Sequence, residues 1–236
     1  MRINKYLAKC GLGSRRKCDE FISSGKIKVN GKIVNDFSLN ISDECFVQFN
    51  NKLINISEDV IYVLNKPRGY ICTKDDNLDR RIIYDLLPNK NNLFSIGRLD
   101  YDTTGILLVT NDGDLSYKLS HPKFNVDKKY YVFTDKKLSN TDIVKVKKGI
   151  KLENDLLKAE IRFLEHINNG YFWDVILKEG KNREIKRIFK YFDSRVLNLH
   201  RYEFAGIKLN GLKEGKYRKL SRKFLNKILK TKKNNY

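Results

Sequence analysis

The sequence predicts an α+β protein made of two domains, and three observations support this. Two helical segments and a strand hairpin fill residues 1–48, residues 49–59 are polar without clear periodicity, and strands alternate with short helices from residue 60 onward. The 236 residues can build a small domain and a medium one, each with its own core. An apolar fraction of 41% indicates folded domains rather than disorder. We therefore expect a domain over residues 1–48, a linker over 49–59 and a larger domain over 60–236.

The first domain is expected to contain two helices followed by a hairpin. Apolar residues at helical spacing predict a first helix that ends at Gly11. Ser14 is a favourable N-cap for a second helix over residues 15–24. The following segment alternates in polarity around Asn30-Gly31, a pair that tolerates the positive φ of a type I′ turn. These elements predict a compact module.

Positive charge is the strongest compositional signal. The net charge is +20 and the isoelectric point is about 9.7, which predicts a polyanionic partner, with nucleic acid ahead of an anionic membrane surface. An A/T-rich genome inflates Lys and Asn counts, but it does not explain where the charge lies. Up to residue 32, nine Lys or Arg stand against two acids, a net of +7.

Three of these cations, Arg15, Arg16 and Lys17, follow one another at a predicted helix start, where the helix dipole disfavours positive charge. Phosphate groups that approach the same helix N-terminus would account for this placement. We expect these three side chains and Lys28 of the hairpin to bind RNA, with a merely solvated basic face as the alternative.

The most unusual stretch, SIGRLDYDTTGILLVTNDGDL (residues 95–115), places polar residues between two apolar runs. If residues 94–99 are extended, Arg98 and Asp100 lie on one side, where the guanidinium would keep the carboxylate ionised and aim it. A buried strand is expected over residues 106–110. We predict that Asp100 is a catalytic nucleophile, while a purely structural Arg–Asp pair remains the alternative on chemistry alone.

No metal site is expected. The four cysteines lack C-x-x-C spacing, which argues against zinc. The segment from Asp100 to Gly105 matches the first positions of an EF-hand calcium loop, but the twelfth position is Asn111 where that pattern requires an acid. The flanking segments also read as strands, so we reject a calcium loop.

Two later segments supply candidate partners for Asp100. Residues 127–134 predict a strand with Tyr130 and Tyr131 on opposite faces, although core packing alone would also explain these rings. The segment EGKNREIKRIFKYF predicts a helix with one apolar face and a basic stripe that includes Arg183 and Lys186. Basic stripes are usually solvated, but this one follows a glycine turn after a core strand, as the start of a site-lining helix does.

These motifs carry two resemblances. RINKYLAKCGLGSRRKCDEFISSGKIKVNGKIV resembles the ribosomal-protein-S4-type RNA-binding domain, which contacts structured RNA mainly by shape and phosphate. GRLDYDTTGILLVTNDGDL, together with NKPRGYICT, KKYYV and EGKNREIKRIF, resembles the signature of bacterial ribosomal RNA pseudouridine synthases of the RsuA/RluB type. The motifs cover nearly the whole chain in the expected order.

The second resemblance implies a fold and a set of site residues. The expected catalytic domain is a mixed, largely antiparallel sheet flanked by helices. Asp100 corresponds to the catalytic aspartate, Tyr130 to the tyrosine that packs on the base, and Lys186 to the basic residue that pairs with the aspartate. Further contacts with the RNA substrate are expected from Arg98, which also supports the loop, and from Arg183 and Arg187.

The implied reaction is the isomerisation of a specific uridine to pseudouridine. It breaks the N1–C1′ bond, turns the uracil and joins C5 to C1′, so no atoms are gained, no redox change occurs, and neither cofactor nor metal is expected. A carboxylate suits the positive charge that develops at C1′. The uridine must also be flipped out of a helix to react.

The expected partner is large-subunit (23S) ribosomal RNA, because FWDVILKEGKNREIKRIF is closer to the large-subunit branch. LNLHRYEFAGIKL is similar to the branch that modifies small-subunit (16S) ribosomal RNA, which is the alternative. A non-catalytic RNA-binding ribosome-assembly factor is the competing class, and a membrane-surface protein is a third. The start of the sequence lacks a signal peptide, and no apolar run approaches the ~20 residues of a membrane span. We expect a cytoplasmic monomer without membrane association.

Overall fold

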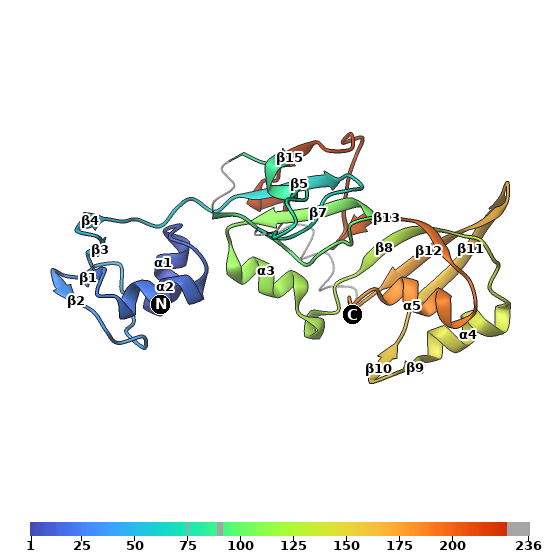
Figure 1. Cartoon of the computed structure of the whole chain (residues 1–236), viewed down its shortest axis with the longest axis horizontal. Coiled ribbons are helices and arrows are strands. Elements are labelled where there is room, and N and C mark those ends of the chain that lie inside the picture. The colour runs from blue at the N-terminus through green and yellow to red at the C-terminus, as the bar shows by residue number, and fades with distance from the viewer. Residues whose placement is uncertain (75, 89–91, 226–236) are drawn as a thin grey trace. The chain divides into compact units, whose positions relative to one another are not determined.

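The computed structural model describes residues 1–74, 76–88 and 92–225, which form two compact units (Figure 1). The first unit contains residues 1–60 together with a short segment that ends at Phe94. The second contains the remaining described residues. Each unit has its own hydrophobic core, as the sequence predicts.

Two helices and a small sheet make up the first unit. Its elements are α1 (Ile3–Lys9), α2 (Arg15–Ser23), β1 (Ile27–Val29), β2 (Lys32–Ile33), β3 (Val47–Phe49) and β4 (Lys52–Leu53). Within the described residues the sheet order is β2-β1-β3-β4, and all neighbours are antiparallel. The predicted cap is confirmed, because the Ser14 hydroxyl accepts a hydrogen bond from the backbone N–H of Lys17. The predicted turn is confirmed by positive φ values at Asn30 and Gly31.

The predicted linker is wrong over its first half. Phe49 ends β3 and residues 52–53 form β4, so this segment belongs to the sheet of the first unit. Asn50 and Asn51 both have positive φ, which makes them the turn of a second hairpin. The two strands are short and β4 is exposed, so the segment lacks the apolar alternation by which a longer strand is recognised.

The second unit is built on a mixed sheet, and within the described residues nine strands take part. The strand order is β11-β12-β8-β13-β7-β5-β15, with β14 beside β13 and β6 beside β7. Their bounds are β5 Ile61–Lys66, β6 Phe94–Ser95, β7 Thr104–Thr110, β8 Lys128–Thr134, β11 Glu160–Ile167, β12 Gly170–Leu177, β13 Val196–Phe204, β14 Ile207–Lys208 and β15 Tyr217–Lys219. Strands β13 and β7 are parallel. The pairs β11–β12, β12–β8, β8–β13, β13–β14, β7–β5 and β5–β15 are antiparallel, which confirms the predicted mixed, largely antiparallel sheet.

Helices lie along one side of this sheet in Figure 1. They are α3 (Gly113–Ser120), α4 (Asn140–Lys148) and α5 (Glu184–Tyr191). The second unit also contains a two-stranded hairpin, β9 (Ile150–Leu152) and β10 (Asp155–Leu157), and the short 3₁₀ turns η1 (Ile83–Leu86) and η3 (Pro122–Phe124). Buried strands β5 and β7 form the centre of the core. The apolar face predicted for α5 is confirmed, because Ile185, Ile188 and Phe189 are buried.

The loop before β7 departs from the sequence prediction. Strand β6 covers only Phe94 and Ser95, although residues 94–99 were expected to be extended. Gly97 has a φ of 70°, a left-handed conformation that ends the strand. Arg98 and Asp100 therefore lie in a loop, and the period-two argument that put them on one side does not apply.

Candidate active site

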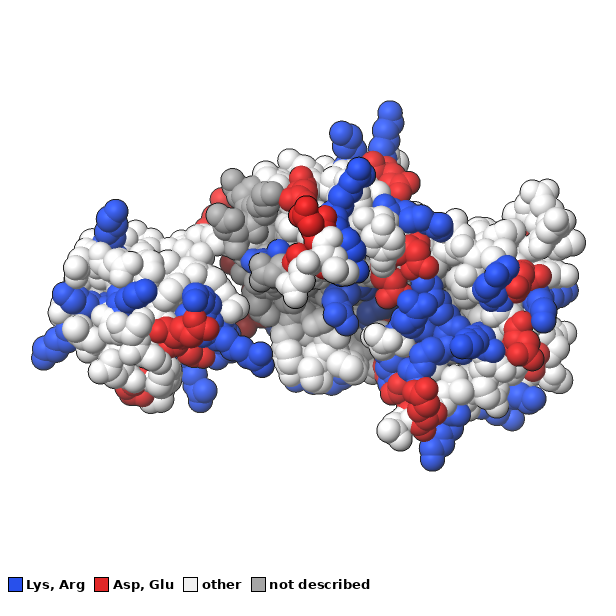
Figure 2. All heavy atoms as spheres, viewed as in Figure 1, with Lys and Arg blue, Asp and Glu red and all other residues white. Residues whose placement is uncertain are grey.

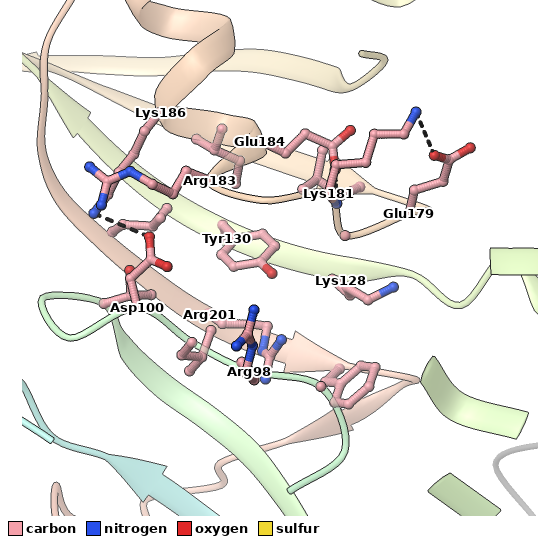
Figure 3. Close-up of a pocket in the computed structure, with 18 of the residues that line it drawn as sticks. Arg98, Asp100, Lys128, Tyr130, Glu179, Lys181, Arg183, Glu184, Lys186 and Arg201 are labelled. Atoms are coloured by element: carbon pink, nitrogen blue, oxygen red, sulfur yellow. Dashed lines mark hydrogen bonds and ion pairs between the residues drawn. The ribbon is translucent and has the colours of Figure 1, made fainter. Parts of the chain in front are cut away.

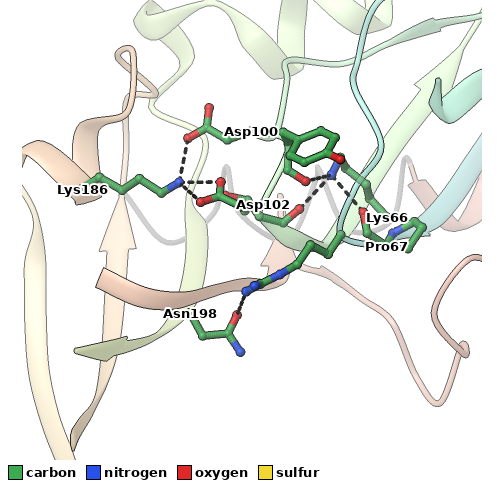
Figure 4. A network of polar contacts seen from close by, with 9 residues as sticks. Lys66, Pro67, Asp100, Asp102, Lys186 and Asn198 are labelled. Atoms are coloured by element: carbon green, nitrogen blue, oxygen red, sulfur yellow. Dashed lines mark hydrogen bonds and ion pairs between the residues drawn. The ribbon is translucent and has the colours of Figure 1, made fainter. Parts of the chain in front are cut away.

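The loop that carries Asp100 is held by a buried lysine. Lys66, the last residue of β5, is fully buried, and its Nζ donates hydrogen bonds to the carbonyl oxygens of Thr103 (2.9 Å), Pro67 (3.0 Å) and Tyr101 (3.4 Å) (Figure 4). Burial lowers the pKa of this ammonium group, and the three carbonyls replace part of its lost hydration. Lys66 was not among the predicted site residues, and the only signal for it was a lysine that closes an otherwise apolar strand.

Lys186, near the start of α5, bridges the two aspartates of this loop (Figure 4). Its Nζ lies 2.5 and 2.7 Å from the two carboxylate oxygens of Asp102 and 3.4 Å from Oδ2 of Asp100. Burial alone would raise the pKa of Asp102, but its hydrogen bond to Lys186 and the charges of Lys186 and Arg183 outweigh that effect and lower it. The side chain of Lys186 is only 13% exposed, so its ion pairs are partly shielded from water.

The geometry agrees with one predicted pairing and differs from another. Lys186 does reach Asp100, but it lies closer to Asp102, for which the sequence predicted no partner. Arg98 is exposed and lines the same cavity as Asp100. Among the described residues, however, the cation within ion-pair distance of Asp100 is Lys186 and not Arg98.

Tyr130 enters the same site from β8. Its side chain is buried on the inner face of the strand, whereas Tyr131 is 38% exposed on the outer face and stacks on Tyr202 with ring centroids 4.2 Å apart. The predicted placement of the two tyrosines on opposite faces is confirmed. The inner ring is thus the one that can meet a group bound near Asp100.

One cavity of about 240 Å³ joins these elements (Figure 3). Its walls come from the loop before β7, the inner faces of β8 and β13, and the start of α5. The cationic side chains that line it are Arg98, Lys128, Lys181, Arg183, Lys186 and Arg201, and the acidic ones are Asp100, Glu179 and Glu184. Figure 2 shows a dense group of Lys and Arg side chains where Figure 1 places α5. The cavity is therefore suited to an anionic ligand.

Several predicted RNA contacts lie outside this cavity. Arg187 points to the β9–β10 hairpin, where its Nη1 lies 2.6 Å from a carboxylate oxygen of Asp155. In the first unit, Arg15, Arg16 and Lys17 are exposed in the first turn of α2, and Lys28 is half-buried in β1. The described residues hold no cluster of three His, Cys, Asp or Glu side chains that could bind a metal ion. No helix in this part of the chain is long and apolar enough to cross a membrane.

Sequence reasoning missed five charged residues of the cavity, Lys128, Glu179, Lys181, Glu184 and Arg201. Arg201 and Glu184 are nearly fully buried. Burial raises the pKa of Glu184, whose carboxylate accepts a hydrogen bond from the backbone N–H of Lys181. The sequence did contain a signal for Arg201, because it is a charged residue at an inward position of a core strand. The sequence alone, however, does not identify which strand and loop this side chain faces.

Lys128 gives this site a testable pH dependence. Burial, followed by the charge of Arg201, lowers the pKa of Lys128 to about 8, while Glu184, Asp127 and Glu179 oppose the shift. The folded chain then binds fewer protons than the unfolded chain between pH 8 and the usual lysine pKa of ~10.4, so the cost of this buried charge disappears as the pH rises through that range. We expect the free energy of unfolding of the wild type to rise relative to that of Lys128→Met between pH 7 and pH 10. Urea unfolding at both pH values measures the free energy of unfolding of the two proteins. A difference between wild type and Lys128→Met that is the same at pH 7 and pH 10 would contradict this prediction.

Comparison with known proteins identifies the family. The family model for RNA pseudouridylate synthase matches residues 60–191, and the S4 domain model matches residues 1–44. The chain belongs to the RNA pseudouridylate synthase family. These matches confirm both resemblances that the sequence motifs indicated.

Individual members of the family match over almost the whole chain. Ribosomal large subunit pseudouridine synthase B of Bacillus subtilis (strain 168) is 36% identical over 225 residues, which cover 93% of this chain and 92% of that protein. Ribosomal small subunit pseudouridine synthase A of Haemophilus influenzae is 32% identical over 234 residues, or 98% and 100% of the two chains. A crystal structure of a pseudouridylate synthase superposes with a TM-score of 0.68 at 31% identity and covers 97% of this chain and 99% of that one. The RsuA/RluB type and the enzyme class are thereby established.

Proposed function

We propose that this pseudouridine synthase converts one uridine of large-subunit ribosomal RNA, held flipped out in the cavity around Asp100. The observation that carries the proposal is the meeting of Asp100, Tyr130 and Lys186 in one cavity, although they lie far apart in the sequence. A cavity of about 240 Å³ has room for a single nucleotide rather than a base pair, so the target must leave its helix. The identity to the Bacillus large-subunit enzyme supports the choice of RNA.

Asp100 is the group that acts on the nucleotide. As the N1–C1′ bond lengthens, positive charge develops on C1′, and a nearby carboxylate offsets this charge or bonds to the carbon. Lys186 positions that carboxylate through a 3.4 Å ion pair and is itself held by Asp102. After the uracil turns, C5 bonds to C1′, a proton leaves C5 and N1 gains one, so the product has the composition of the substrate.

Tyr130 provides the surface for the base. Its ring is buried on the cavity wall, and a flipped base can stack on such a ring because every base has a π face. Stacking keeps the uracil in place while it is detached from the sugar. A bound nucleotide that fills the cavity displaces water from C1′, where water would give hydrolysis instead of isomerisation.

Mapping pseudouridines in ribosomal RNA from cells that lack this protein tests the proposal. We expect one pseudouridine of 23S RNA to disappear and to return with the wild-type gene but not with an Asp100→Asn gene. A loss confined to 16S RNA would instead support the small-subunit alternative, which the Haemophilus small-subunit relative favours by its full coverage. Unchanged pseudouridines in both RNAs would contradict the proposal.

The start of α5 is expected to contact RNA phosphate. Arg183 lines the cavity and also a second, more open pocket with Lys190 and Arg195, so its guanidinium lies among cations where a phosphate would be stabilised. We expect Arg183→Gln to weaken RNA binding and to reduce the slope of log K against log salt by about 1. Arg187→Gln is the matched control, because the same charge is removed from the same helix but Arg187 is already paired with Asp155. Fluorescence-anisotropy titrations measure the RNA affinity of both variants. Equal losses of affinity in Arg183→Gln and Arg187→Gln would contradict the expected difference between the two arginines.

A further inference from the structure

Arg201 is a buried cation in the cavity with no assigned role. It lies on the inner face of β13 and is 2% exposed, and its Nε donates a hydrogen bond to the carbonyl oxygen of Ile106 at 2.8 Å. Its Nη2 is buried and has no hydrogen-bond partner among the described residues. No carboxylate of the described chain lies within ion-pair distance of it, since the ion pairs found there do not include Arg201. Such a group is costly to bury, so its retention requires a reason.

The surrounding structure holds the guanidinium in place. Strand β13 runs parallel to β7 with Arg201 opposite Gly105, which brings the arginine beside the strand that follows the Asp100 loop. Its Cζ lies 4.7 Å from the ring centroid of Phe204 and 6.0 Å from that of Tyr130. Figure 3 shows Arg201 and Tyr130 directed into the same cavity. The side chain is thus preorganised in the wall next to the ring on which the base is expected to stack.

Two further side chains in this part of the cavity, Thr103 and Lys128, can donate hydrogen bonds to a ligand. The hydroxyl of Thr103 is also buried without a partner and also lines the cavity. Lys128, whose Nζ donates a hydrogen bond to the carbonyl oxygen of Val126 at 2.9 Å, adds a second cation close enough for the charge of Arg201 to lower its pKa. The wall therefore presents donors and positive charge to a group that enters the cavity.

We propose that the guanidinium of Arg201 donates a hydrogen bond to a carbonyl oxygen of the flipped uracil and compensates the negative charge that the base acquires when the N1–C1′ bond breaks. This inference rests on the proposed function. In that step the electron pair of the N1–C1′ bond stays with the uracil, whose ring oxygens share the charge. No proton moves until C5 has bonded to C1′. Arginine suits the role because it has donors only and keeps its charge.

The test compares Arg201→Met and Arg201→Lys with the wild type in single-turnover reactions on RNA that carries uridine or 5-fluorouridine at the target. Tritium release from C5 measures the reaction of uridine. C5 of 5-fluorouridine carries fluorine and has no proton to release, so chromatography of digested RNA measures its disappearance after the N1–C1′ bond has broken and C5 has bonded to C1′. Loss of a preorganised donor typically costs ~10²–10³-fold in rate. We expect a loss of that order for Arg201→Met on uridine, with RNA affinity within about 3-fold of the wild type, and a smaller loss for Arg201→Lys. Because fluorine itself stabilises the uracil anion, the loss for Arg201→Met should shrink at least 10-fold on 5-fluorouridine, and the loss for Arg201→Lys should also shrink.

The controls separate this role from a structural one. Arg162→Met is matched in chemistry but alters an exposed arginine paired with Asp174, and it should leave both rates unchanged. If Arg201→Met does not fold, Arg201→Lys still shows whether the loss of rate is smaller on 5-fluorouridine than on uridine. Equal losses on uridine and 5-fluorouridine, or rates equal to the wild type, would overturn the role of Arg201 while leaving the proposed function intact. A wild-type protein that modifies neither ribosomal RNA would overturn the proposed function itself.

Discussion

Asp100→Asn is expected to abolish pseudouridine formation while leaving RNA binding intact. An amide cannot offset positive charge on C1′ or bond to it as a carboxylate does, so we expect the single-turnover rate to fall by on the order of 10³-fold or more. The protein has a net charge of +20, and the loss of one negative charge does not weaken its attraction to phosphate. Tritium release from C5-labelled RNA measures the rate, and fluorescence anisotropy measures the affinity.

Asp102→Asn is the matched control for this prediction. It makes the same chemical change two residues away and removes the closest partner of Lys186, but it leaves the 3.4 Å contact between Lys186 and Asp100 available. We expect a rate loss of only about 10-fold, because a positioning contact is weakened while the reacting carboxylate remains. If Asp102→Asn were the more damaging change, the assignment of the chemistry to Asp100 would be wrong. Matching circular dichroism spectra would establish that both variants fold.

Features that depend on neighbours in the sequence were predictable. Ser14 caps α2 as expected, because an N-cap acts on backbone N–H groups only two or three residues ahead. The strand that includes residues 106–110 could be recognised from its unbroken apolar run. The short β3–β4 hairpin was missed, since its turn is Asn50-Asn51 and not the Asn-Gly pair by which the equally short first hairpin was recognised.

Features that depend on strand order were not predictable from the residues alone. The neighbours of Arg201 follow from the parallel pairing of β13 with β7, and nothing within either segment specifies that pairing. Arg187 was expected to face RNA, but a distant hairpin brings Asp155 to it. Lys186 reaches both Asp100 and Asp102 in a turn that is closed by a hydrogen bond from the Thr103 N–H to the Asp100 carbonyl oxygen, and the sequence does not show which distant helix faces that turn. The resemblance to a family supplied Asp100, Tyr130 and Lys186 as a set, which local patterns alone did not.

The second large effect is expected at Gly105, where β7 begins beside β13. Gly105 is buried with a φ of 107°, and a Cβ there would collide with the backbone carbonyl oxygen of Arg201 and approach its backbone nitrogen to 2.7 Å. Both atoms belong to the strand backbone, which cannot move aside as a flexible side chain can. We expect Gly105→Ala to lower the free energy of unfolding by about 3–5 kcal/mol, from the clash and the strained φ together. Urea unfolding followed by circular dichroism measures this change.

Gly113→Ala is the control for Gly105→Ala. It makes the same substitution in the same unit, but at a position with neither a clash at the added Cβ nor a positive φ. Gly113 is the first residue of α3, and a Cβ there meets no atom within 4 Å. Alanine should be neutral or stabilising by up to about 1 kcal/mol at this position. A similar loss of stability in both variants would mean that the close approach of β7 and β13 is not what requires glycine. If Gly105→Ala is as damaging as expected, the parallel strand pair that holds the Asp100 loop next to Arg201 depends on the absence of one methyl group.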